Sequence, residues 1–196
     1  LQAAADTGAG EVGDLVLGTR DLASLPAAEI EQVFHLKTTR YTFEAPLALG
    51  AILAGAAERD DGAVLLDLAR IAEPLGLAFQ IGNDLADFAG EGLDLVSGKR
   101  TLLLHLAHAG LPETEQALLR LALGLPGADP SRLPILRDLV AKSGAPALLE
   151  RRRGALRRQA REELDRAFAH EAAIHAGFAA LLDSLDALDG RPARPC

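Results

Sequence analysis

The chain has 196 residues and a formal net charge of −8, and 49% of its residues are hydrophobic but only 4% are aromatic. This length allows one domain with a substantial core, while the negative charge argues against general binding to nucleic acid. No apolar run approaches the roughly 20 residues of a transmembrane helix, and no signal peptide is evident. The only cysteine, Cys196, excludes an internal disulfide framework and fits a reducing, cytoplasmic location.

Leucine and alanine dominate the sequence and strand-like alternation is nearly absent, so we expect a single all-α domain over residues 1–196. Helices separated by glycine and proline turns are predicted over 1–17, 27–57, 62–88, 102–109, 112–123, 131–142, 146–170 and 171–188. Irregular segments are predicted at 18–26, 58–62, 90–98 and 190–196.

Three details of this helix pattern can be tested. Ser24 is expected to cap the second helix, with Pro26 near its first turn. Pro46 cannot donate a backbone hydrogen bond, so it should kink or break the pattern over 27–57. The glycine-rich segment 90–98 is expected to be a flexible loop.

The most informative segment is 79–88, which reads FQIGNDLADF. Helical spacing places Asn83, Asp84 and Asp87 on one side, with Gln80 one turn earlier. Two carboxylates and a carboxamide in an otherwise apolar segment are costly unless a cation meets them. One interpretation is a Mg²⁺ site, because Mg²⁺ takes oxygen ligands and commonly shares substrate phosphates. The other interpretation is a polar helix face that meets water.

The lysines suggest a partner for such a metal. Only Lys37, Lys99 and Lys142 occur among 20 basic residues. An ammonium acts as a compact charge toward phosphate, whereas a guanidinium prefers planar, bidentate pairing. Lys37, which precedes Thr38, and Lys99, which lies between Gly98 and Arg100, are therefore candidate phosphate contacts, although chance placement is the alternative.

Together these segments resemble motifs of the trans-isoprenyl diphosphate (polyprenyl) synthase family, and its bacterial members in particular. Segment 79–88 is similar to the second aspartate-rich motif, FQ-x-x-DD-x-x-D. Segment 10–14 resembles the GQ-x-x-D motif, 37–38 the KT motif and 98–101 the GK-x-T motif. The resemblance covers roughly residues 1–165 and is more specific than any one motif.

The resemblance implies an isoprenoid-synthase-type helical bundle around a central cavity, of which this chain forms the C-terminal part. It implies a Mg²⁺-dependent prenyltransferase that condenses an allylic prenyl diphosphate with isopentenyl diphosphate to a longer trans-polyprenyl diphosphate. Because the family usually forms dimers, a homodimer is expected. The implied metal ligands are Asn83, Asp84 and Asp87. The implied catalytic residues are Lys37 and Lys99, which bind diphosphate, and Thr38 and Gln80, which position it and line the site.

The sequence also departs from the family pattern. Asn83 replaces the usual aspartate, and Glu11 replaces the usual glutamine. The first aspartate-rich motif, which in the family precedes the position of Glu11, is missing from the chain. Because the chain begins at Leu1 and has no methionine, we expect an upstream segment that this sequence does not show.

Two alternatives to chain elongation therefore stay open. One is a class I terpene synthase-like cyclase, which Asn83 favours because those enzymes also use asparagine among their Mg²⁺ ligands. The other is a non-catalytic homologue or partner subunit that binds a prenyl diphosphate or another chain. Product chain length is not encoded in the segments that this chain contains.

Overall fold

The computed structural model describes residues 2–56, 58, 62–124 and 129–189, and every regular element in these residues is a helix. The elements follow in the order α1 (Gln2–Gly18), η1 (Leu22–Ser24), α2 (Ala27–Phe34), η2 (His35–Glu44), α3 (Ala45–Leu53), α4 (Ala63–Ala89), α5 (Leu93–Ser97), α6 (Leu102–Gly110), α7 (Glu113–Leu123), η3 (Pro130–Arg132), α8 (Leu133–Lys142), α9 (Ala145–Phe168) and α10 (Ala172–Asp189). The all-α prediction is therefore confirmed.

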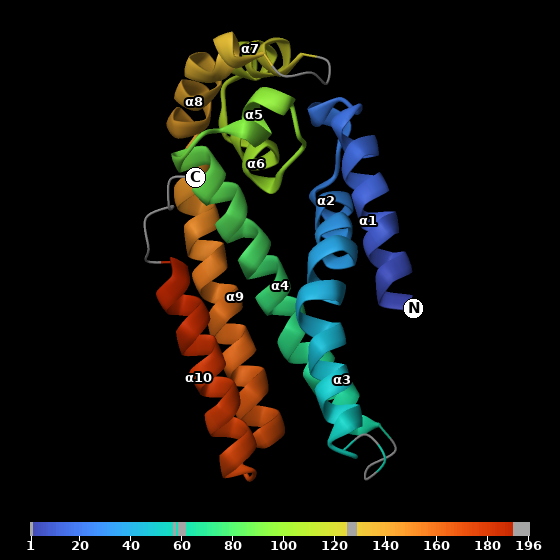
Figure 1. Ribbon diagram of the computed structural model, residues 1–196. Coiled ribbons are helices and arrows are strands. Elements are labelled where there is room, and N and C mark those ends of the chain that lie inside the picture. The colour runs from blue at the N-terminus through green and yellow to red at the C-terminus, as the bar shows by residue number, and fades with distance from the viewer. Residues whose placement is uncertain (1, 57, 59–61, 125–128, 190–196) are drawn as a thin grey trace.

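The two longest helices, α4 and α9, lie side by side and form the centre of the molecule (Figure 1). Helix α10 packs along α9, while η2 packs between α4 and α1 on the other side. The short helices α5 to α8 gather at one end (Figure 1). No helix in the described residues is both long and apolar enough to cross a membrane.

The hydrophobic core consists of two clusters joined by α4 and α9. The first includes Phe34, Ile81 and Leu149, and the second includes Ile71 and Leu164. All five side chains are essentially inaccessible to solvent. Burial of each such side chain contributes about 1.5–3 kcal/mol, so the core holds α4 and α9 together along most of their length.

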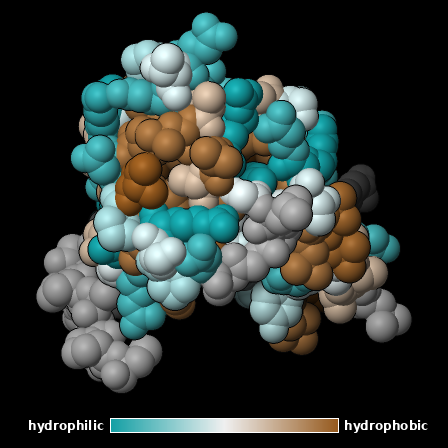
Figure 2. All heavy atoms as spheres, turned by 90° about the horizontal axis from the view of Figure 1, so that it is seen from above, coloured by the Kyte–Doolittle hydropathy of each residue, from teal (hydrophilic) through white to brown (hydrophobic). Residues whose placement is uncertain are grey.

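Large apolar side chains are also exposed at the surface. Seen from above, hydrophobic residues gather in separate patches, one of them on the side where α1 lies (Figure 2). On α1 the exposed residues are Val12, Leu15 and Val16, and Leu121 of α7 is likewise exposed. The outer face of α1 is thus more apolar than the surface of a helix that meets only water.

The prediction that Ser24 caps the second helix was wrong. Helix α2 begins at Ala27 with Pro26 as its N-cap residue, and Ser24 ends the preceding 3-10 turn η1. The reason is steric, because a residue before proline is driven away from the helical conformation. Leu25 accordingly has extended angles, φ −92° and ψ 112°. The cap is supplied instead to η1 by Asp21, whose carboxylate accepts a hydrogen bond from the Ala23 N–H at 3.2 Å.

Pro46 does not break the chain's helical path. It lies in the first turn of α3, directly after the ten-residue π-helical segment η2. A proline ring clashes with the carbonyl four residues earlier in an α-helix. The wider π turn removes this conflict, and the Ala45 N–H donates to the carbonyl of Arg40, five residues back. The sequence therefore widens the helix before Pro46 rather than ending it.

The segment 90–98 is not an unstructured loop, because it contains the short helix α5. Gly92 and Gly98 flank α5 with positive φ angles of 71° and 73°, which glycine adopts without strain. The helical pattern predicted over 27–57 ends earlier than expected, at Leu53. The other predicted helices agree with the structure within one or two residues at each end, and the start of the helix predicted at 131 forms the 3-10 turn η3. Most of the predicted turn 58–62 and all of the tail 190–196 lie outside the described residues.

Two glycines let η2 approach its neighbours closely. A Cβ atom on Gly10 of α1 would lie 2.6 Å from the Lys37 backbone nitrogen. A Cβ atom on Gly76 of α4 would lie 2.1 Å from Thr39 Oγ1 and 2.7 Å from Thr39 Cα. Contacts this short never occur between real Cβ atoms and backbone, so only glycine allows these three backbones to lie together.

The Gly76→Ala substitution should therefore destabilise the fold. The added methyl group must push η2 away from α4, which costs about 1–3 kcal/mol and lowers the melting temperature. Gly50→Ala is the matched control, because Gly50 also lies inside a helix but has open space around its missing Cβ. It should stabilise the protein by about 0.5–1 kcal/mol. Equal melting temperatures for the two variants would contradict the close approach.

Candidate functional site

Lys37 and Lys99 converge on one aspartate of α1. Lys37 Nζ lies 2.7 Å from Asp14 Oδ2 and 3.7 Å from Glu11 Oε2. Lys99, which follows α5, places its Nζ 3.8 Å from the same Asp14 oxygen and 3.3 Å from Asp94. The side chains of Lys37 and Asp14 are each only 13% exposed, so solvent screens this contact weakly. Segments far apart in the sequence therefore deliver two ammonium groups to one place.

A chain of buried hydrogen bonds links η2 to α4 beneath these lysines. The Thr38 hydroxyl donates to Gln80 Oε1 at 2.9 Å, and Gln80 Nε2 donates to Asp84 Oδ1 at 3.0 Å. All three side chains are no more than 6% exposed. The second carboxylate oxygen of Asp84, Oδ2, is buried and has no hydrogen-bond partner. Such an orphaned oxygen is costly unless a cation or a proton satisfies it.

The electrostatics of the site follow from burial. The pKa of Asp84 is raised to about 7, chiefly by burial, with smaller contributions in the same direction from Asp94 and Asp14, while Gln80 and Lys99 act in the opposite direction. Burial also raises the pKa of Asp94. For Lys99 burial opposes protonation, but Asp94, Asp14 and Asp84 together raise the pKa above its ordinary value. Lys99 thus stays charged, whereas Asp84 takes up a proton near neutral pH.

The other two predicted metal ligands differ in their surroundings. Asp87 is partly buried, and its two carboxylate oxygens accept hydrogen bonds from the backbone N–H groups of Leu93 and Asp94, each at 3.0 Å. Asp87 therefore holds the start of α5. The side chain of Asn83 is exposed and forms no hydrogen bond with the described residues. The three side chains lie on neighbouring turns of α4, but only Asp84 is deeply buried.

The donors fit a hard divalent cation by their chemistry. The predicted ligands Asn83, Asp84 and Asp87 all offer oxygen atoms, as Mg²⁺ requires. Asp84 Oδ2 supplies the strongest local argument, because it is a buried carboxylate oxygen without a partner. In the part of the chain that the structure describes, however, no three His, Cys, Asp or Glu side chains form a group that could hold a metal by themselves. A cation here would need further ligands, such as water or substrate oxygens.

Sequence reasoning missed two acidic residues of this cluster as site residues. Asp14 was included only as the last residue of segment 10–14, which resembles the GQ-x-x-D motif, and no role was assigned to it, yet it contacts both lysines. Asp94 was assigned to a loop, although it belongs to α5 and pairs with Lys99. The signal available for Asp94 was its position between Gly92 and Gly98, which favours an ordered turn with fixed ends.

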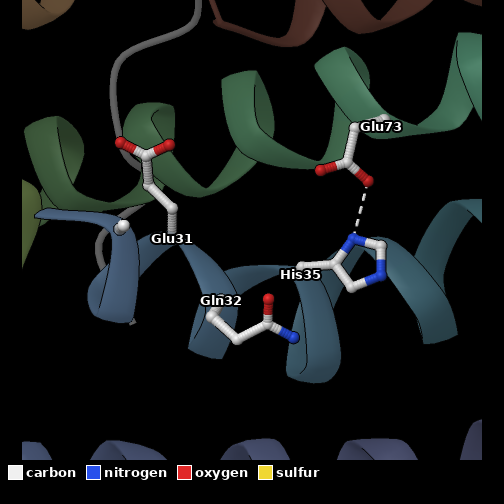
Figure 3. Close-up of a pocket in the computed structure, with 5 residues that line it drawn as sticks. Glu31, Gln32, His35 and Glu73 are labelled. Carbon is white, nitrogen blue, oxygen red and sulfur yellow. Dashed lines mark hydrogen bonds and ion pairs between the residues drawn. The ribbon is translucent and has the colours of Figure 1, made fainter.

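A pocket of about 370 Å³ lies elsewhere, between α2, η2 and α4 (Figure 3). His35 and Glu73 point toward each other across it, with 2.6 Å between Nδ1 and Oε2. Glu31, also at this pocket, pairs with Arg152 of α9 at 2.8 Å. None of the predicted site residues lines the pocket. The candidate site is thus marked by converging charges rather than by this cavity.

Comparison with known proteins agrees with the motifs. Residues 1–132 match the family described as polyprenyl synthetase. The chain belongs to the polyprenyl synthetase family. The match includes Asp14, Lys37, Asp84 and Lys99, so the whole charged cluster lies in the part that defines the family. No curated protein sequence matches the chain significantly.

Solved structures of polyprenyl synthetases share the fold. A polyprenyl synthase from Caulobacter crescentus CB15, complexed with calcium and isoprenyl diphosphate, is 28% identical with a TM-score of 0.71, over 83% of this chain and 50% of its own. A decaprenyl diphosphate synthase from Rhodobacter capsulatus is 25% identical with a TM-score of 0.74, and the match covers 98% of this chain and 57% of that chain. A geranylgeranyl pyrophosphate synthase from Corynebacterium glutamicum, complexed with isoprenyl diphosphate and magnesium, is 23% identical with a TM-score of 0.73. This match covers 89% of this chain and 51% of that chain. The chain spans about half the length of these structures.

The raised pKa of Asp84 predicts a pH-dependent stability for the metal-free polyprenyl synthetase chain. Between pH 4 and 7 the unfolded chain ionises Asp84 while the folded protein keeps the proton, so stability falls as pH rises. The full penalty, reached above the folded pKa of about 7, is on the order of 4 kcal/mol.

Asp84→Asn should remove this pH-dependent loss of stability. In the presence of a chelator, the melting temperature of the variant should therefore fall less between pH 4.5 and 7.5 than that of the wild type. Asp138→Asn, on the exposed surface of α8, is the control and should follow the wild type. Parallel curves for the wild type and Asp84→Asn would show that Asp84 titrates normally.

Proposed function

We propose that this protein is a prenyltransferase that joins an allylic prenyl diphosphate to isopentenyl diphosphate. The observation that carries the proposal is the convergence of Lys37 and Lys99 on Asp14, beside the buried carboxylate of Asp84. Membership of the polyprenyl synthetase family supports prenyl chain elongation in general. We infer further that residues 1–196 form one domain that corresponds to the C-terminal part of the family's helical bundle, and that the first aspartate-rich motif belongs to the part without a counterpart here.

In this proposal the two lysines bind the diphosphate. Each ammonium exchanges its contact with Asp14 for a phosphate oxygen, to which a charged donor binds about twice as strongly as a neutral one. Thr38 and Gln80 keep the Asp84 carboxylate in place through hydrogen bonds that end at Oδ1, which leaves Oδ2 available to a cation. Helix α5, held by Asp87, keeps Lys99 within reach.

Asn83, Asp84 and Asp87 are the proposed ligands of Mg²⁺. The bound ion neutralises charge on the departing diphosphate. Support comes from the orphaned oxygen of Asp84 and from the calcium and isoprenyl diphosphate in the Caulobacter relative.

The proposed reaction breaks the allylic C–O bond and releases diphosphate. The double bond of isopentenyl diphosphate then attacks the allylic cation, and loss of one proton restores a double bond in the product. The residues of this chain supply charge on the diphosphate side through Lys37 and Lys99. Buried polar groups positioned in advance stabilise developing charge without reorganising during the reaction.

Product analysis separates this function from its two alternatives. The protein is incubated with Mg²⁺ and an allylic prenyl diphosphate, with and without isopentenyl diphosphate, and products are identified by mass spectrometry. Elongation gives a longer prenyl diphosphate only when isopentenyl diphosphate is present. A cyclic hydrocarbon or alcohol formed without it indicates the cyclase that Asn83 favours. Binding without turnover indicates the non-catalytic homologue.

The expected homodimer and cytoplasmic location remain predictions. The exposed apolar face of α1, with Val12, Leu15 and Val16, is a surface that a second helical element could cover. Light scattering of the purified protein measures its mass in solution and tests the dimer directly.

Lys99→Ala should weaken the binding of a non-reactive prenyl diphosphate analogue by about 10- to 100-fold. Loss of one charge-assisted contact costs about 1.5–3 kcal/mol, which corresponds to that range. Lys142→Ala is the matched control, because Lys142 pairs with Glu115 between α8 and α7, away from the site. Isothermal titration calorimetry measures both affinities. If the two variants bind the analogue equally, Lys99 is not a diphosphate contact.

Asn83→Asp should lower the Mg²⁺ concentration required for half-maximal turnover. A carboxylate binds Mg²⁺ more strongly than a neutral amide oxygen does. Because Asn83 is exposed, the change should cost little stability when Mg²⁺ is bound. In metal-free protein it should be mildly destabilising, since it adds a charge next to Asp84. The measurements are a Mg²⁺ titration of activity and melting curves with and without Mg²⁺; an unchanged Mg²⁺ dependence argues that Asn83 is not a ligand.

A further inference from the structure

A separate pocket of about 240 Å³ lies where the end of α1, the start of α6 and the end of α7 meet. Its lining residues are Thr19, Arg20, Asp21, Leu22, Arg100, Arg120, Leu123 and Gly124. It shares no residue with the lysine and aspartate cluster. Lys99 and Arg100 are neighbours in the chain, but Lys99 pairs with Asp94 and Asp14 while Arg100 contacts the end of α1. The segment between α5 and α6 therefore contributes one positively charged side chain to the lysine and aspartate cluster and another to this pocket.

Arg100 is a buried charge without a bonded carboxylate. The residue is only 6% exposed to solvent. Its Nε atom donates to the backbone carbonyl of Arg20 at 3.0 Å, and one terminal nitrogen donates to the carbonyl of Gly98 at 2.5 Å. Burial lowers the pKa of Arg100, and Asp21 acts in the opposite direction. A buried guanidinium bonded only to carbonyl groups retains a full positive charge that favours an anion.

Arg120 adds a second guanidinium from the last turn of α7. It is exposed, and its guanidinium group forms no hydrogen bond or ion pair with the described residues. Its charge reaches into the surrounding structure, because burial and then Arg120 lower the pKa of His108 on the neighbouring helix α6.

The remaining charges of this pocket are already engaged. Arg20 pairs with Glu29, and the carboxylate of Asp21 accepts a hydrogen bond from the backbone of η1. The pocket is therefore lined by two arginines without a bonded carboxylate, Arg100 and Arg120, and by one aspartate, Asp21, that caps η1. In a protein with a net charge of −8, this excess of positive charge is local.

We propose that this pocket binds a small phosphate-bearing anion through Arg100 and Arg120. The planar guanidinium of Arg120 presents paired donors that match two phosphate oxygens. Arg100 already donates through Nε and one terminal nitrogen to carbonyl groups, so it contributes its charge and its other terminal nitrogen. The pocket volume of about 240 Å³ is large enough for a phosphate or diphosphate group. Because the pocket is built from other residues than the candidate active site, this binding does not depend on the proposed prenyl transfer.

The test is a titration of the full chain with inorganic phosphate at constant ionic strength. Binding is measured by amide NMR shifts and by calorimetry. Phosphate should shift the amide signals of Thr19, Leu22 and Gly124. Arg120→Gln should weaken phosphate binding by about tenfold, because it removes one charge-assisted contact. Arg70→Gln, which removes the same charge from a surface pair on α4, should bind like the wild type. A parallel titration with inorganic diphosphate shows whether the pocket favours one phosphate group or two.

Three outcomes would overturn the proposal. The first is no phosphate binding by the wild type up to about 10 mM, a concentration that detects even weak sites. The second is phosphate binding that Lys99→Ala abolishes and Arg120→Gln leaves intact, which would place the anion at the lysine cluster. The third is an equal response to sodium chloride, which would indicate screening rather than a site. Because Arg120 is exposed, its substitution should leave the circular dichroism spectrum unchanged.

Discussion

The candidate site depends on how closely η2 is held between α1 and α4. Gly10 lies against the backbone of Lys37, and Gly76 lies against Thr39 on the opposite side. Since backbone meets backbone at both points, η2 cannot shift without displacing a neighbouring helix. The side chains of residues 37 and 38 are therefore presented from a fixed frame, which is the condition for a site that must hold charges at set distances. The π-helical geometry of η2 belongs to this arrangement, as such turns often occur at functional positions.

The charges at the site are close to balance, but not neutral. Lys37 and Lys99 face Asp14 and Asp94, while Asp84 below them has no cation of its own. A diphosphate that arrived alone would meet these carboxylates as well as the lysines. A divalent cation would offset the negative charge of these carboxylates. Charge balance therefore favours binding of the diphosphate together with such a cation. The same excess of carboxylates contributes to the raised pKa of Asp84.

The sequence predicted well those features that depend on periodicity, and less well those that depend on tertiary contacts. The helix at 62–88 and the position of Asp84 within it followed from spacing alone, and the structure has α4 there. Pro46 was expected to kink or break the helix, and the structure shows no break, because a π turn that a residue pattern does not reveal precedes it. The order of segment 90–98 was also missed. It arises from backbone hydrogen bonds to Asp87, on the preceding helix, which composition cannot indicate.

The double hydrogen bond to Asp87 has a consequence for the thermodynamics of ligand binding. A glycine-rich segment that ordered only on binding would lose about 1–2 kcal/mol of backbone conformational entropy for each residue fixed. Here Asp87 and the helical turn of α5 fix this segment through contacts within the chain itself. That entropy is lost during folding instead, so the contact energy of Lys99 is available for affinity. We therefore expect the heat capacity change on binding to reflect buried surface rather than coupled folding.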